Sequence, residues 1–236
     1  MKHFFITLTI LLVAYSASLA QWSGSLTLGT SFNSGNINKF DIASNGDISH
    51  KDSLFEFSSY YKMLYSEVNN LQNSEEYAGG IKFDYQPYSN FTPFILGVAY
   101  QNFYKNIELR TSALAGAKYR IFRSETADYS FSAAVQYDIN RYIAETEDDN
   151  ITRLSFRPKI KQKLGDYVTF EHVTFYQPNI SAFDDFLIDS TTSLKSKVTD
   201  ILALQITYNI EYVNKPTKED LKKTDQYMLA SLVLSF

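Results

Sequence analysis

The sequence predicts an all-β fold, a transmembrane antiparallel up-and-down β-barrel of about twelve strands. Three observations support this prediction: the chain opens with an export signal, apolar residues recur at every second position, and aromatic residues are frequent. Tyrosine and phenylalanine each number 18 among 236 residues, and the chain has no cysteine. An exported chain without cysteine has no disulfide framework, so its stability must come from its strands.

The first twenty residues have the order of a secretory signal peptide. Lys2 and His3 precede an apolar run from Phe4 to Tyr15, and small residues lead up to Ala20. This run is shorter than the roughly 20 residues that a transmembrane helix needs. We therefore expect residues 1–20 to be a cleaved signal peptide and residues 21–236 to form the barrel. A lipoprotein signal is excluded because there is no cysteine to acylate.

Twelve segments of the mature chain alternate apolar and polar residues, so each predicted strand has one apolar and one polar face. These segments are longer than the roughly 5–6 residues usual in soluble proteins, and long enough to cross a bilayer when tilted. They span residues 22–33, 38–50, 53–66, 74–86, 91–104, 108–122, 128–143, 150–164, 167–180, 187–198, 201–213 and 223–236.

The connections between these segments alternate in length, apart from 105–107 and 123–127. Outer-membrane barrels have short periplasmic turns and longer external loops. The short connections are 50–52, 88–90, 164–166 and 198–200, and the longer ones are 67–73, 144–150, 178–186 and 213–223. A closed barrel also leaves no unpaired sheet edge in the bilayer. We therefore expect a bacterial outer-membrane location, with outer-membrane lipid and lipopolysaccharide as partners.

Aromatic residues cluster near the ends of the predicted strands. Such rings prefer the level of the lipid headgroups, which predicts two aromatic girdles around the barrel. Their members would be Tyr60, Tyr61, Tyr65, Tyr85, Tyr88, Phe91, Phe103, Tyr104, Phe122, Tyr142, Tyr167, Tyr212 and Tyr227.

The last predicted strand ends in an alternating apolar run that closes on an aromatic residue. Leu232, Leu234 and Phe236 occupy alternate positions at the carboxyl terminus. This ending resembles the carboxyl-terminal signal of outer-membrane barrels. The resemblance implies that the outer-membrane assembly machinery reads these three residues as an assembly signal.

If the apolar faces meet lipid, the charged side chains on the other faces point into the lumen. One wall is then basic and another largely acidic, which leaves two interpretations open. The charges could form a constriction that selects small anions, or they could pair across the barrel as a packed polar core. The residues predicted to line the lumen are Arg110, Lys118, Arg120, Arg153, Arg157, Lys159, Asp41, Glu56 and Asp84.

Two stretches resemble a known family. Residues 22–38, "WSGSLTLGTSFNSGNIN", and residues 191–225, with a Pro-bearing loop and "KKTD" before the last strand, carry the likeness. They resemble the outer-membrane family named domain of unknown function 481, whose members are often labelled salt-induced outer membrane proteins. One departure is the last loop, where the family often has paired prolines and this chain has only Pro216. The resemblance implies the fold and location, and it supplies no ligand or catalytic residues.

Candidates for catalysis are few, and we expect no enzyme. His50 falls in the predicted turn 50–52, which leaves His172 as the histidine within a predicted strand. His172-x-Thr174 resembles the His-x-Ser arrangement of outer-membrane lipid hydrolases. Acidic residues at 147–149 and 184–185 are interpreted as solvated loops, so no metal or cofactor is expected. The net charge of −4 argues against nucleic acid as a partner.

The leading hypothesis is a monomeric outer-membrane barrel of structural or envelope-stress function, or a narrow porin-like channel with a charged lumen. Two alternatives stay open. One is an outer-membrane lipid hydrolase using His172. The other is a soluble periplasmic lipocalin-like binding barrel, which would need an apolar interior and a polar exterior.

Overall fold

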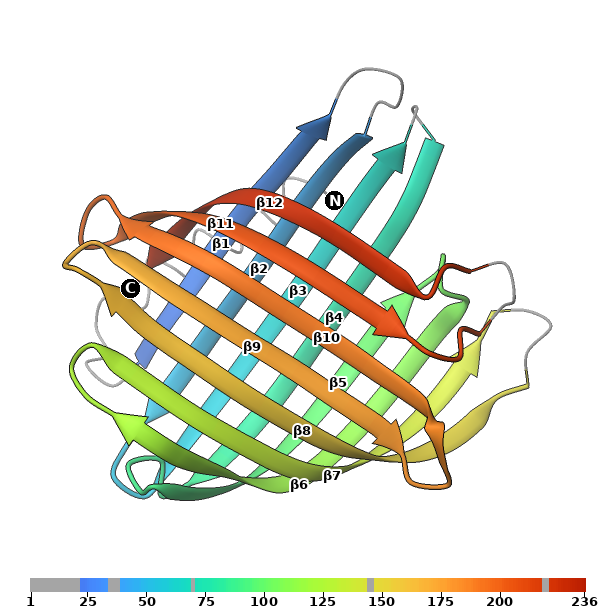
Figure 1. Ribbon diagram of the computed structural model, residues 1–236, viewed down its shortest axis with the longest axis horizontal. Helices are drawn as coiled ribbons and strands as arrows, with labels where there is room; N and C mark the ends of the chain where they lie inside the picture. Colours follow the sequence, from blue (N-terminus) through green and yellow to red (C-terminus); the bar gives the residue numbers. More distant parts are fainter. Residues whose placement is uncertain (1–21, 34–38, 69–70, 144–146, 218–220) are drawn as a thin grey trace.

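The computed structural model describes residues 22–33, 39–68, 71–143, 147–217 and 221–236, and the predicted signal peptide lies outside them. Twelve strands form one closed antiparallel barrel (Figure 1). They are β1 (Trp22–Asn33), β2 (Lys39–Lys51), β3 (Phe55–Val68), β4 (Leu71–Tyr85), β5 (Phe91–Asn102), β6 (Ile107–Arg123), β7 (Ala127–Tyr142), β8 (Asp149–Leu164), β9 (Val168–Asn179), β10 (Ala182–Lys197), β11 (Leu202–Val213) and β12 (Thr224–Ser235).

Each strand pairs with its neighbours in sequence, and β1 pairs with β12 to close the barrel. The predicted fold class, an up-and-down antiparallel barrel of twelve strands, is confirmed. The predicted strand ends agree with the structure to within three residues, except that β10 begins at Ala182 rather than 187. Among the described residues, no helix is long and apolar enough to cross a membrane.

Two of the predicted longer loops, 178–186 and 67–73, are wrong. β9 runs to Asn179 and pairs there with Ala182, and the ladder then shifts register before Phe186. Similarly, β3 reaches Val68 and β4 begins at Leu71. In both places a polar stretch continues the backbone pairing. A polar stretch therefore shows where the apolar surroundings of a strand end. It does not show where the backbone pairing ends, because the hydrogen-bonded ladder extends further.

The outer surface is apolar and the interior is polar. On β7, Val135 and Ile139 are exposed on the outside, while Gln136 and Asp138 are buried inside. Ile121 on β6 remains 63% exposed. Exposed apolar bands of this kind suit a lipid environment. The pattern is the reverse of what a soluble lipocalin-like barrel requires and contradicts that alternative.

The girdle prediction is correct for some aromatic residues and wrong for others. Tyr88, Phe91 and Tyr167 are exposed near strand ends, as expected for residues at the headgroup level. Tyr142 and Tyr227, in contrast, line the interior. Closeness to a strand end gives the depth of a residue, whereas its place in the alternation decides which face it occupies.

The seam between β1 and β12 closes on the last residue. Gly24 N–H donates to the Phe236 carbonyl oxygen at 3.0 Å, and Phe236 N–H donates to the Gly24 carbonyl oxygen at 3.1 Å. A Cβ atom on Gly24 would lie 2.7 Å from Cζ of Phe236 and 2.6 Å from the carbonyl oxygen of Asp47. Glycine at position 24 therefore lets the terminal ring pack against the seam. A role of Leu232, Leu234 and Phe236 as an assembly signal stays a prediction.

Gly24→Val is expected to destabilise the folded barrel by about 1–3 kcal/mol, because the added side chain overpacks a ring and a backbone oxygen. Gly97→Val on β5 is the matched control, since a Cβ atom there meets nothing within 4 Å. The measurement is the urea dependence of the heat-modifiable band on a denaturing gel. Equal midpoints for the two variants would contradict the close packing at the seam.

Candidate functional site

The barrel encloses a cavity of about 1110 Å³. It is lined by inward-facing residues of the strands and, at one end, by Lys215, Thr217 and Lys222 of the β11–β12 connection. Three of the predicted lumen residues line it, namely Arg110, Arg153 and Arg157. The other six do not belong to the described lining: Lys118, Arg120, Lys159, Asp41, Glu56 and Asp84.

Each of these six contacts a polar partner that lies on the same strand or no more than two strands away. Asp84 is 2.6 Å from Lys82 and 4.0 Å from Lys118. The remaining contacts are Glu56 to Lys51 at 3.2 Å, Lys159 to Glu171 at 2.7 Å, Arg120 to Asp128 at 3.7 Å, and Asp41 to the Ser31 hydroxyl at 2.5 Å. These six residues therefore pair with nearby strands and not, as one interpretation predicted, across the barrel.

Ion pairs that do cross the lumen also involve Glu211 and Lys105, which sequence reasoning missed. Lys62 on β3 lies 2.6 Å from Glu76 and 3.8 Å from Glu211 of β11. Lys105, in the β5–β6 turn, contacts Glu211 and lies 3.1 Å from Asp225 of β12. The contacts of Glu211 with Lys62 and Lys105 bring together parts of the barrel that are not neighbours in the strand order. Alternation places the strand residues of this group inside the barrel, but only the closed barrel shows that they meet.

Lys105 also anchors the β11–β12 connection. The Thr217 hydroxyl donates to its carbonyl oxygen at 2.6 Å. Burial is the largest single effect and lowers the pKa of Lys105, but Glu211, Tyr100 and Asp225 together outweigh it and raise the pKa above its ordinary value. The ammonium group therefore stays charged at the mouth of the cavity and holds β11 and the loop in place.

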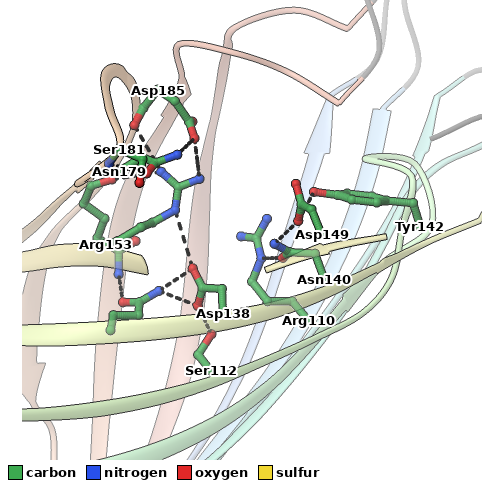
Figure 2. Close-up of polar contacts among 12 residues, drawn as sticks. Arg110, Ser112, Asp138, Asn140, Tyr142, Asp149, Arg153, Asn179, Ser181 and Asp185 are labelled. Atoms are coloured by element: carbon green, nitrogen blue, oxygen red, sulfur yellow. Dashed lines mark hydrogen bonds and ion pairs between the residues drawn. The ribbon is translucent and has the colours of Figure 1, made fainter. Parts of the chain in front are cut away.

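A second cluster surrounds Arg153 (Figure 2). Its Nε lies 3.5 Å from Asp138 Oδ2, and its Nη2 donates to Asp185 Oδ2 at 3.1 Å. Asp138 also accepts from the Ser112 hydroxyl at 2.5 Å and from Gln136 at 2.8 Å. Asp185 was predicted to be a solvated loop residue, but it lies in β10 and accepts from Arg153. The prediction failed because polar residues here continue the strand.

Arg110 lies beside this cluster and lacks a carboxylate partner. Its Nε donates to Asn140 Oδ1 at 2.6 Å, and Asn140 in turn donates to Asp149 at 2.7 Å (Figure 2). In the part of the chain that the structure describes, neither Arg110 nor Arg157 forms an ion pair within 4.0 Å. Of the three arginines that line the cavity, Arg153 is therefore neutralised by carboxylates, whereas Arg110 and Arg157 are not.

His172 lies on the outer face of β9, within a row of hydroxyl groups. Its Nδ1 is 2.8 Å from the Thr192 hydroxyl, and its Nε2 is 3.1 Å from the Thr174 hydroxyl. Thr174 also contacts Ser190 at 3.1 Å. Thr192 supplies a hydroxyl where hydrolytic triads have a carboxylate or amide that orients the imidazole. No such group contacts His172 among the described residues, so the structure adds no acidic partner for the enzymatic alternative.

Solved structures of porins share this fold. The NanC porin matches with a TM-score of 0.55 and 10% identity, over 89% of this chain and 98% of that one. The KdgM porin in complex with disordered oligogalacturonate matches with a TM-score of 0.48 and 12% identity, over 90% and 99% of the two chains. At such identity the NanC match shows the fold alone.

No curated protein sequence matches the chain significantly. The profile of the family described as "Protein of unknown function, DUF481" matches residues 26–236. This range takes in all twelve strands apart from the first residues of β1. The family predicted from residues 22–38 and 191–225 is therefore confirmed, and the chain belongs to the DUF481 family.

Proposed function

We propose that this protein is an outer-membrane channel with a narrow, charged lumen for small solutes. The observation that carries the proposal is the cavity of about 1110 Å³ inside the closed barrel, whose lining includes charged and polar side chains among apolar ones. A barrel of twelve strands lies between the filled barrels of eight and the open channels of sixteen or more. Its interior is therefore wide enough for a narrow path.

The outer surface supports a membrane location for this channel. Ile95 is 60% exposed and Leu204 is 53% exposed, and both lie on the outside of their strands. Water would make so much exposed apolar surface costly, whereas hydrocarbon does not. The fold shared with the NanC porin agrees with the proposal. An envelope-stress role is compatible with a channel, since solute passage can itself be regulated.

Purified protein in planar lipid bilayers is expected to give discrete conductance steps. Replacing Arg110, Arg120 and Arg157 together by glutamine should change the ion preference, because it removes three lumen-side positive charges. Arg123→Gln is the control, since Arg123 is exposed at the end of β6. The reversal potential in a salt gradient is the measurement. Absence of any conductance in the unaltered protein would overturn the channel function.

A further inference from the structure

We propose that the lumen contains a binding site for a small organic carboxylate, centred on the guanidinium group of Arg157. This inference rests on the proposed channel function and deepens it by naming the solute class. Arg157 lies on β8, and its side chain lines the cavity.

Arg157 marks the inner end of the cavity. On β8 the inward residues Arg153, Ser155 and Arg157 line it, and the next inward residue, Lys159, does not. On the neighbouring β7 the lining likewise ends at Ser132, which lies opposite Arg157 in the strand register. A solute that enters beside the β11–β12 connection would therefore reach Arg157 at the end of its path through the cavity.

Among the described residues, no carboxylate lies within 4.0 Å of the Arg157 guanidinium. Its Nε is buried and has no hydrogen-bond partner in the described structure. Its guanidinium carbon lies over the Phe175 ring, 5.0 Å from the ring centroid, so an aromatic surface covers part of the group. Burying a charge without a partner is costly. A guanidinium that stacks through its face leaves its N–H edge available to an anion.

The nearest carboxylates are already engaged by lysines. Glu171 and Asp84 interact electrostatically with Arg157. Glu171 lies 2.7 Å from Lys159, and Lys82 donates to both oxygens of Asp84 at 2.6 and 2.7 Å. Lys118 also lies 4.0 Å from Asp84 and interacts electrostatically with Glu56, which pairs with Lys51. Lysines therefore take up these carboxylates, and the positive charge of Arg157 is left to attract an anion.

A glycine keeps the space in front of Arg157 open. Tyr60 on β3 interacts with Arg157 electrostatically, although β3 lies five places from β8 around the barrel. A Cβ atom on Gly80 would lie 2.4 Å from Cε1 of Tyr60, so the ring lies flat against the wall over this glycine. A larger residue at position 80 would push the ring into the lumen. Gly80 thus keeps the Tyr60 ring against the wall at the level of Arg157.

These features define the class of ligand. A carboxylate can accept two parallel hydrogen bonds from the edge of a guanidinium, and the rings of Phe94 and Phe175 give the lining an apolar part. The volume of about 1110 Å³ leaves room for a small organic acid beyond its carboxylate group. Gluconate is a suitable probe, and sorbitol is its uncharged counterpart.

The test compares Arg157→Gln with Lys222→Gln, which removes the same charge from the lining at the other end of the cavity. Unaltered channels are expected to prefer chloride over potassium and to be blocked by gluconate but not by sorbitol. Arg157→Gln should raise the gluconate concentration for half-block about tenfold or more. Lys222→Gln should leave it within about twofold, because screening weakens a distant exposed charge.

If Arg157→Gln channels conduct with unchanged chloride preference and gluconate block, the anion site is overturned and the channel function stands. If the unaltered protein does not conduct, the channel function is overturned. Calorimetry of gluconate binding to the detergent-solubilised barrel then decides the site alone. Binding that Arg157→Gln abolishes and Arg157→Lys partly restores supports the site, and equal binding by all three proteins refutes it. The heat-modifiable band checks that each variant is folded.

Discussion

Ala133→Arg is expected to destabilise the barrel in lipid by about 2–4 kcal/mol, whereas Ala134→Arg should cost much less. The two alanines are adjacent near the middle of β7 and differ in the face they occupy. Ala133 is exposed on the outer surface, and Ala134 lines the cavity. An arginine at position 133 would bring a charge into the hydrocarbon, while one at position 134 could extend into a polar space.

The measurement is urea unfolding in lipid vesicles, followed by the fluorescence of Trp22, the single tryptophan. The pair controls for depth, strand and residue type at once, because only the direction of the side chain changes. A smaller cost at position 133 than at 134 would mean that the apolar and polar faces are assigned the wrong way round.

Arg153→Met should cost about 3–5 kcal/mol, because it leaves a buried carboxylate without its cation. Asp138 is fully buried and Arg153 is 3% exposed. After the substitution, Asp138 would keep Ser112 and Gln136 as its side-chain donors among the described residues. The free energy of unfolding in vesicles is again the measurement.

A second variant separates charge from packing. Arg153→Met combined with Asp138→Leu removes the buried pair, and replacing such a pair by apolar residues is often nearly neutral. Asp185, which is less buried than Asp138, also loses its arginine but keeps Asn179 as a donor. The double variant is therefore expected to recover at least half of the loss. If the cost of the double variant equals the sum of the costs of Arg153→Met and Asp138→Leu, the two side chains act independently.

The sequence alone predicted most of the barrel, because alternation and strand length are local properties. Along β7, for example, Phe131 to Ile139 alternate between lipid and lumen as the pattern indicates. The start of β10 was missed because Asp184 and Asp185 look like a solvated loop. In the structure Asp185 instead accepts from Arg153 inside the barrel.

The candidate site was less predictable. Arg110, Arg153 and Arg157 could be assigned to the lumen face from parity alone. Which arginine lacks a carboxylate partner depends on how far side chains reach across strands. Asp84, for example, is held by Lys82 and Lys118. The contacts of Glu211 with Lys62 and Lys105 depend on which strands face each other once the barrel has closed. Neither property is encoded in the spacing of residues along one strand.

The strand order also bears on how the protein folds. Eleven of the twelve strand pairings join neighbours in sequence, so hairpins can form successively with short loop closures. Only the β1–β12 pairing among the described strands brings opposite ends of the chain together, as Ser25 and Ser235 show. Until it forms, both terminal strands present open edges that a second copy could pair with. Folding yield should therefore reflect a kinetic competition between closure within one chain and association between chains, and it should fall as protein concentration rises.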